Sequence, residues 1–169
     1  MPEKQTLERA KQDLREGKSP STTAGEFVHE EIEHVREGKH GARSPQQAVA
    51  IGLSKARRAG IPLPPPKRGK VKEETRKSAE RDYQKGQAGR DHKPSRHASR
   101  ARQEVLEREP HSTTSRESLS KQSRAAAPGR SGEDHHRSAQ RAVQTKGKEE
   151  LQLAAKKGAR TRALKSSEA

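Results

Sequence analysis

Histidine and glutamate side chains gather in one short stretch of the chain, His29-Glu30-Glu31-Ile32-Glu33-His34. Zinc peptidases hold their ion with two histidines four residues apart, because that spacing puts both rings on one face of a helix. Here the two histidines are five positions apart, which separates their rings by about 140° around a helix. The spacing therefore predicts a solvated helix face, with no metal site and no catalytic residue.

Two other short patterns also fail as enzyme motifs. Gly17-Lys18-Ser19 matches the end of a phosphate-binding loop, but Gln12 stands where that motif needs its first glycine. We interpret it as a helix end followed by a turn. In Asp134-His135-His136 the two histidines are adjacent, so their rings would diverge on a helix, and we interpret this stretch as a polar disordered tract. We expect no enzyme activity, no cofactor and no small-molecule substrate.

Positive charge is the remaining chemical signal. The chain has 38 Lys and Arg against 23 Asp and Glu, a net charge of +15. Residues 1–60 carry only +2 of this, and residues 61–169 carry +13. Such asymmetry indicates a nucleic-acid or other polyanionic partner, because Lys and Arg can replace the counterions around phosphates. The candidate nucleic-acid-binding residues are those of one loop, one helix end and one linker: Lys39, His40, Arg43, Lys55, Arg57, Arg58, Lys67, Arg68, Lys70 and Lys72.

The mode of binding follows from what accompanies these cations. With one Phe, one Tyr and no Trp, the chain lacks the aromatic side chains that stack on unpaired bases. Glycines in the loop would let backbone N–H groups approach phosphates. A helix-turn-helix reader is disfavoured, because the loop between its two helices is longer than such motifs use. We expect largely sequence-independent binding to a duplex backbone, with double-stranded DNA as the partner.

An alternative reading of the same charge also stands. The 14 acidic residues among the 27 basic ones of residues 61–169 would repel phosphates locally, and charge runs often serve only solubility. In that case the chain is a hydrophilic protein-interaction or stress-protective protein, and residues 21–59 dock a protein partner.

The folded part of the chain is expected to be small. Only 19 of 169 residues are Leu, Ile, Val or Phe, about 11%, which is below the share at which a highly charged chain is expected to fold throughout. Eleven of these 19 lie in residues 1–65. We therefore predict a mostly α protein with extensive disorder: a small helical domain at 1–60, a proline-rich basic linker at 61–70, and a basic, partly helical, flexible tail at 71–169.

Capping residues and apolar spacing locate the expected helices. Residues 4–18 have apolar residues at helical spacing. The next helix ends at Gly38. Ser21, Thr22 and Thr23 offer capping hydroxyls, with Glu26 at capping-box spacing from Thr23, and Ser19-Pro20 repeats the Ser-Pro pattern of Ser44-Pro45. This helix carries an apolar stripe, with Glu26, Glu30, Glu31 and Glu33 covering its other side. Another helix, from Ser44-Pro45 to Gly60, has Val49, Leu53 and Ala56 on its apolar face. These segments predict a helical hairpin or a three-helix unit.

Beyond the proline run Ile61-Pro62-Leu63-Pro64-Pro65-Pro66, the composition favours helices that form on a partner. They are expected at 71–87, 97–109, 133–145 and 149–164.

The sequence predicts no secretory signal and no membrane span. There is no cysteine, the chain opens on charged residues without an apolar signal region, and no apolar run approaches the ~20 residues of a membrane span. We expect a cytoplasmic protein, located at the nucleoid, with no membrane partner.

The stretch from Ala24 to Pro66, which holds two expected helices, the loop between them and the proline run, resembles a family of small basic bacterial proteins of unknown function, the DUF6496 type. The resemblance covers residues 1–85 nearly end to end. It implies a bacterial source and a candidate DNA-binding protein, and it carries over no binding residue.

Overall fold

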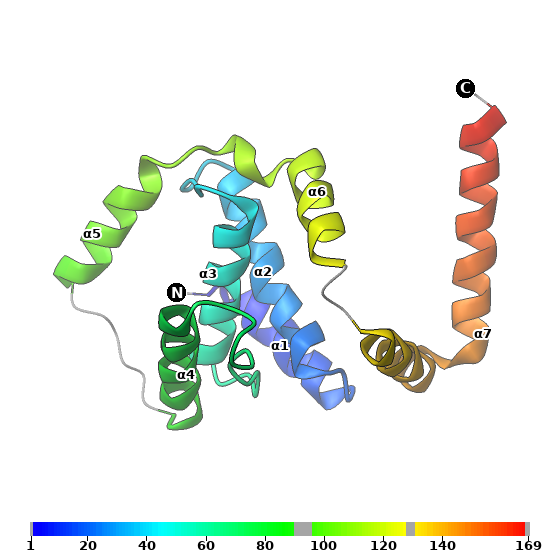
Figure 1. Ribbon diagram of the computed structural model, residues 1–169, viewed down its shortest axis with the longest axis horizontal. Coiled ribbons are helices and arrows are strands. Elements are labelled where there is room, and N and C mark those ends of the chain that lie inside the picture. The colour runs from blue at the N-terminus through cyan, green and yellow to red at the C-terminus, as the bar shows by residue number, and fades with distance from the viewer. Residues whose placement is uncertain (1, 90–95, 128–130, 168–169) are drawn as a thin grey trace. The chain divides into compact units, whose positions relative to one another are not determined.

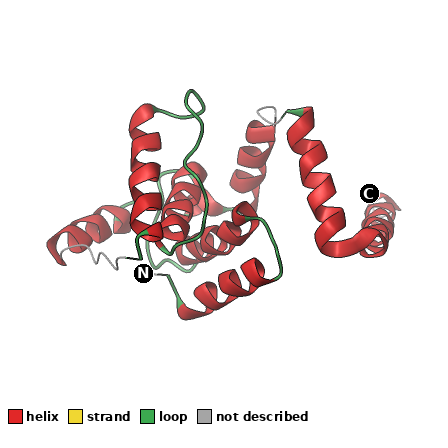
Figure 2. Ribbon diagram, turned by 90° about the horizontal axis from the view of Figure 1, so that it is seen from below, coloured by secondary structure: helices red, strands yellow, loops and turns green. Residues whose placement is uncertain are grey.

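The computed structural model describes residues 2–89, 96–127 and 131–167, and these residues form helices and no strand (Figures 1 and 2). This confirms the mostly α prediction. The helices in chain order are α1 (Lys4–Arg15), α2 (Pro20–Arg36), α3 (Pro45–Arg58), α4 (Glu73–Gln87), α5 (Arg96–Glu107), the short 3-10 helix η1 (Ser112–Thr114), α6 (Arg116–Ala126) and α7 (Gly132–Ser167). The chain divides into two compact units, Met1–Ala125 and Ala126–Ala169.

The ends of the first three helices follow one pattern. Gly17, Gly38 and Gly60 all have positive φ, at 74°, 76° and 87°. Each glycine N–H donates to the carbonyl three residues back, and the next N–H donates to the carbonyl five residues before it. This is the Schellman arrangement, which satisfies the free carbonyls of a helix end and needs a residue without a β-carbon. The sequence-based helix stops at these three glycines are confirmed.

The helix starts are equally local, with one correction. Ser44 caps α3 and accepts from Gln47 N–H at 3.3 Å, with Pro45 at the first position. At α2 the cap is Ser19, followed by Pro20, and not one of the three predicted hydroxyl residues Ser21, Thr22 and Thr23. Thr23 lies fully buried inside the helix. The Ser-Pro pair prevailed because proline is preorganised for the first helical position, where its missing N–H costs nothing.

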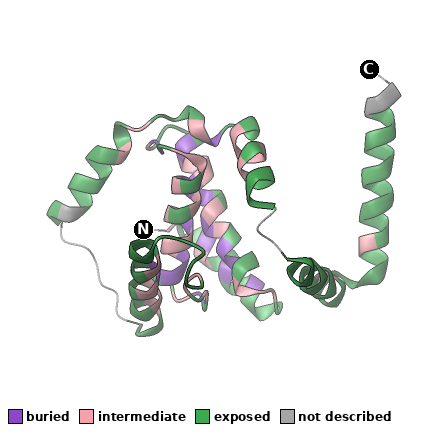
Figure 3. Cartoon of the chain, in the orientation of Figure 1, coloured by how far each residue is buried: buried purple, intermediate pink, exposed green. Residues whose placement is uncertain are grey.

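The core of the first unit lies between α1, α2 and α3 and is built mainly of small residues (Figure 3). Phe27 is its one large aromatic side chain and is completely buried. The buried members are Ala10, Ala24, Phe27, Ala56 and Ile61, with Leu7, Leu53 and Leu63 packed partly against them. A second cluster, Val35, Ala42 and Ala48, lies near the loop between α2 and α3.

The backbones of α2 and α3 lie unusually close together where the two helices pack. The buried stripe of α3 is Ala48, Gly52 and Ala56, a face of small residues. Of the predicted face, Ala56 is buried and Leu53 packs partly against the core, but Val49 is only half-buried, and Ala48 and Gly52, expected at its flank, form the centre of the contact. A β-carbon at Gly52 would lie 2.6 Å from the Cα of Val28, closer than real side chains approach. The two helices therefore pack backbone to backbone, which pure apolar periodicity does not reveal.

Helical packing continues beyond the proline run, because α4 packs against α3. Asp82 of α4 accepts from the Ser54 hydroxyl at 2.6 Å, and Gln87 donates to the Gly60 carbonyl at 3.1 Å. The two helices also meet closely where a β-carbon on Gly86 would collide with the carbonyl of Arg57. The compact unit thus extends past residue 60.

A strap formed by residues 106–114 covers the loop between α2 and α3. The N–H groups of Gly41 and Ala42 donate to the carbonyls of Leu106 and Pro110 at 2.8 and 3.0 Å. In return, the Thr113 hydroxyl donates to the Ala42 carbonyl at 2.8 Å. These bonds join positions about 70 residues apart in the sequence.

The second unit consists largely of α7, whose side chains are mostly exposed. Gly147 lies inside it with φ 75° and ψ 158°, so α7 is two helices joined at a kink. The two arms match the helices predicted at 133–145 and 149–164, and α4 and α5 match those at 71–87 and 97–109. α6 lies in a Ser-rich stretch where no helix was predicted. The extensive disorder and the three-part domain division remain predictions.

Candidate functional site

A buried ionic cluster lies where α2 faces α3. Glu31 is 1% exposed and Glu30 5% exposed. Lys55 of α3 reaches both carboxylates, with its Nζ 2.5 Å from Glu31 Oε2 and 3.3 Å from Glu30 Oε1. The prediction that Glu30 and Glu31 lie on the solvent side of the helix is therefore wrong, because α3 packs directly over them.

Glu30 is held in its ionised form by neighbours from three segments. Burial alone would raise the pKa of Glu30, but hydrogen bonds from the Glu3 N–H and the Thr6 side chain, together with the Lys55 ammonium, outweigh burial and lower it. The Glu3 N–H lies 3.1 Å from Glu30 Oε2. Glu30 thus ties the start of α1 to α2 and α3.

Two histidines stand at the edge of the same cluster. His40, from the loop after α2, has its Nε2 3.2 Å from Glu31 Oε1. His34 of α2 has its Nε2 3.0 Å from Glu3 Oε1. The two rings meet edge to face, with centroids 6.0 Å apart. The sequence interpretation compared His34 with His29 and missed this group, whose only signal was the three-residue step from Glu31 to His34 on one helix face.

Five of the ten predicted nucleic-acid-binding residues make contacts within the protein. His40 and Lys55 belong to the ionic cluster. Lys39 lies 3.2 Å from Glu3 and 3.0 Å from Glu37, and these contacts raise its pKa. Arg57 is 8% exposed and donates to the carbonyls of Leu63 and Pro64, which fixes the proline run against α3.

Arg58 completes this inward-directed set. Its Nη2 donates to the Ser54 hydroxyl at 3.1 Å, and its Nε lies 3.7 Å from Asp82 of α4. Its side chain is still 41% exposed, so a phosphate could reach it at the cost of the weak ion pair with Asp82. The N–H group of the loop glycine Gly41, which we expected to meet phosphates, already donates to the strap, as does that of Ala42.

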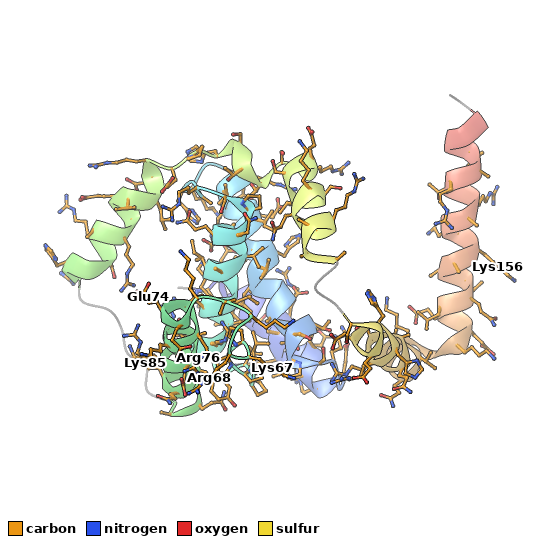
Figure 4. All side chains as sticks on the ribbon, viewed as in Figure 1. Lys67, Arg68, Glu74, Arg76, Lys85 and Lys156 are labelled. Atoms are coloured by element: carbon orange, nitrogen blue, oxygen red, sulfur yellow. The ribbon has the colours of Figure 1, made fainter. Side chains whose placement is uncertain are left out.

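The other five predicted residues are exposed: Arg43, Lys67, Arg68, Lys70 and Lys72. Within the part of the chain that the structure describes, their side chains form no ion pair with a carboxylate. Arg68 lies close enough to Glu73 to help lower the pKa of that carboxyl, after the larger effect of Arg76. Four of the five belong to the linker that precedes α4, where Figure 4 shows Lys67 and Arg68.

A second exposed basic stretch lies in the C-terminal arm of α7. Residues 151–167 contain five Lys or Arg and no Asp or Glu. Lys156, Lys157, Arg160 and Arg162 are all exposed, and Figure 4 shows Lys156 on this arm. The candidate residues named from the sequence did not include this arm. The absence of acidic residues was visible in the sequence and would have identified it.

Two surface hollows among the described residues each lie along a single helix. One follows α7 from Gly132 to Gln140, and another follows α1 from Gln5 to Arg15. Neither brings residues of two elements together around a substrate. Among the described residues, no helix is both long enough and apolar enough to cross a membrane.

Comparison with known proteins gives no relative: no family model matches the chain, and no curated protein or solved structure is significantly similar to it. The resemblance to small basic bacterial proteins therefore stays a prediction.

Proposed function

We propose that the protein binds double-stranded DNA through the phosphate backbone, without strong sequence preference and without catalysis. The observation that carries the proposal is the linker, where Lys67, Arg68, Lys70 and Lys72 are exposed and no acidic residue lies between Ile61 and Lys72. Cations that form no internal ion pair lose little when they contact phosphates, and they release counterions from the duplex.

The folded helices would hold this linker in place. Arg57 binds the carbonyls of Leu63 and Pro64 at one end of the linker, and α4 packs on α3 at the other. In this proposal the C-terminal arm of α7 adds a second set of backbone contacts, and parts of the tail become ordered only on DNA. A nucleoid location in the cytoplasm would follow from such binding.

The test is a titration of a labelled random-sequence duplex with the full-length protein at several salt concentrations, read by fluorescence anisotropy. We expect micromolar-class binding whose log–log salt slope is about −0.9 per phosphate contact. The triple variant K67Q/K70Q/K72Q should make this slope shallower by about 2.7.

A matched control separates the linker from net charge. Arg100, Lys121 and Arg137 each pair with a glutamate one turn away on their own helix, at 3.3, 3.1 and 4.0 Å. The variant R100Q/K121Q/R137Q loses the same charge, and its slope should change by less than about one unit. Equal losses in both variants would show that total charge, and not the linker, sets affinity. No binding by the unchanged protein at low salt would favour the protein-interaction alternative.

A further inference from the structure

Glu31, His34 and His40 come together at the edge of the ionic cluster, and each offers one ligand atom within 4.8 Å of the others. Glu31 and His34 are three residues apart on α2, so they share one face of the helix. His40 comes from the loop beyond the Schellman turn at Gly38. The glycine turn therefore folds the chain back and places a second imidazole beside the first.

The Glu31 carboxylate has unused binding capacity. It is 1% exposed, and neither of its oxygens has a partner with hydrogen-bond geometry. Lys55 provides charge at Oε2, at 2.5 Å, while Oε1 faces His40 Nε2 at 3.2 Å. A buried carboxylate oxygen without a donor is costly unless a proton or a cation satisfies it.

The hydrogen bonds around His40 fix its tautomer. Its Nδ1 lies 3.1 Å from the Gly41 carbonyl, which can only accept. Nδ1 therefore carries the hydrogen in the neutral ring, and the lone pair is on Nε2, which lies 3.2 Å from Glu31 Oε1. Two ligands bound to one tetrahedral zinc ion at about 2.0–2.1 Å are roughly 3.3 Å apart, which matches the 3.2 Å between these two atoms.

His34 has the outer contact that metal-binding histidines commonly have. Its Nε2 lies 3.0 Å from Glu3 Oε1, and a carboxylate accepts, so Nε2 carries the hydrogen in the neutral ring and Nδ1 keeps its lone pair. A carboxylate on the far nitrogen of a ligating histidine orients the ring and makes it a better ligand. Both His34 and His40 retain partial exposure, at 13% and 15% of their side chains.

We infer that Glu31, His34 and His40 bind one divalent transition-metal ion of the Zn²⁺ class, with solvent as the remaining ligand. Two imidazoles and one carboxylate are a ligand set that zinc favours. The local charge also suits a dication, because the three carboxylates of Glu3, Glu30 and Glu31 outnumber the ammonium groups of Lys39 and Lys55. The site is independent of DNA binding and would fix the loop after α2 to the helix.

The experiment titrates ZnCl₂ into the full-length protein, freed of metal by dialysis against a chelator, with calorimetry to give stoichiometry and affinity. We expect one strong site per chain. Replacing one ligand, in H34Q or H40Q, should weaken it at least about tenfold. The control H29Q changes an exposed histidine of the same helix, and H135Q/H136Q removes the adjacent pair on α7; neither should change the affinity of the strong site.

Ring nitrogen NMR of the unchanged protein gives a readout that needs no variant. On addition of one equivalent of Zn²⁺, we expect the signals of His34 and His40 to shift and those of the other histidines to stay in place. Shifts confined to His135 and His136, an affinity unaffected by H40Q, or no zinc uptake would each overturn the inference.

Discussion

Replacing Gly52 with alanine should destabilise the protein, although alanine is the better helix former. A β-carbon at position 52 would lie 2.6 Å from Val28 Cα and 2.9 Å from the Phe27 carbonyl oxygen. Both contacts are with backbone, so no side chain can rotate away and α2 and α3 must separate. Overpacking of this kind costs about 1–3 kcal/mol, and the gain in helix propensity returns about 1 kcal/mol. We expect a net loss of up to about 2 kcal/mol.

Gly25 provides the matched control, because it lies within α2 and nothing stands within 4 Å of its would-be β-carbon. G25A should stabilise the protein by about 1 kcal/mol through helix propensity alone. Thermal unfolding followed by circular dichroism should place the two Tm values roughly 5–10 °C apart on opposite sides of the unchanged protein. A G52A protein at least as stable as the unchanged protein would refute the close backbone packing of α2 on α3.

Two further predictions concern the buried ionic cluster. K55M should destabilise the protein by about 3 kcal/mol, because it leaves buried carboxylates unpaired. The double variant E31Q/K55M should recover part of that loss, with a coupling energy between the two positions of at least about 1 kcal/mol. Effects of the two substitutions that simply add in urea denaturation would contradict the pairing of Lys55 with Glu31. The pKa of Glu30 is lower in the folded protein than its ordinary value of 4.5. Ionised Glu30 therefore stabilises the fold fully at pH values above 4.5, and this stabilisation is lost as the pH falls through the lowered pKa. The variant E30Q should therefore show a flatter fall in Tm between neutral and acid pH, and an unchanged acid dependence would show that Glu30 has no part in it.

Local chemistry made the helix ends predictable. A glycine at a Schellman turn and a serine before a proline act through neighbouring residues only, so Gly17, Gly38, Gly60 and Ser44 could be assigned from the sequence. The start of α2 was misassigned because two local signals compete there, and Ser19-Pro20 prevailed over the capping pattern at Thr23.

The candidate sites depended on long-range contacts and were harder to predict. Glu30 and Glu31 lie in a stretch rich in acidic residues that is typical of a solvent face, and their burial depends on partners from other segments, Lys55 of α3 for both and Glu3 for Glu30. His40 was expected to meet phosphates, and its proximity to Glu31 depends on how the loop folds back. The exposed linker cations required no such information, because no acidic residue lies among them between Ile61 and Lys72.

The backbone amides of Gly41 and Ala42 can be used to observe residues 106–114, which form the strap over their loop. Their donors are held by the carbonyls of Leu106 and Pro110, so their hydrogen-exchange rates measure how often residues 106–114 detach from the loop, and not the fraying of α2 or α3. Closing a loop of about 70 residues costs considerable chain entropy. These two amides would therefore lose protection before those in the middle of α2, and their exchange would also show whether a ligand bound near the loop stabilises the strap.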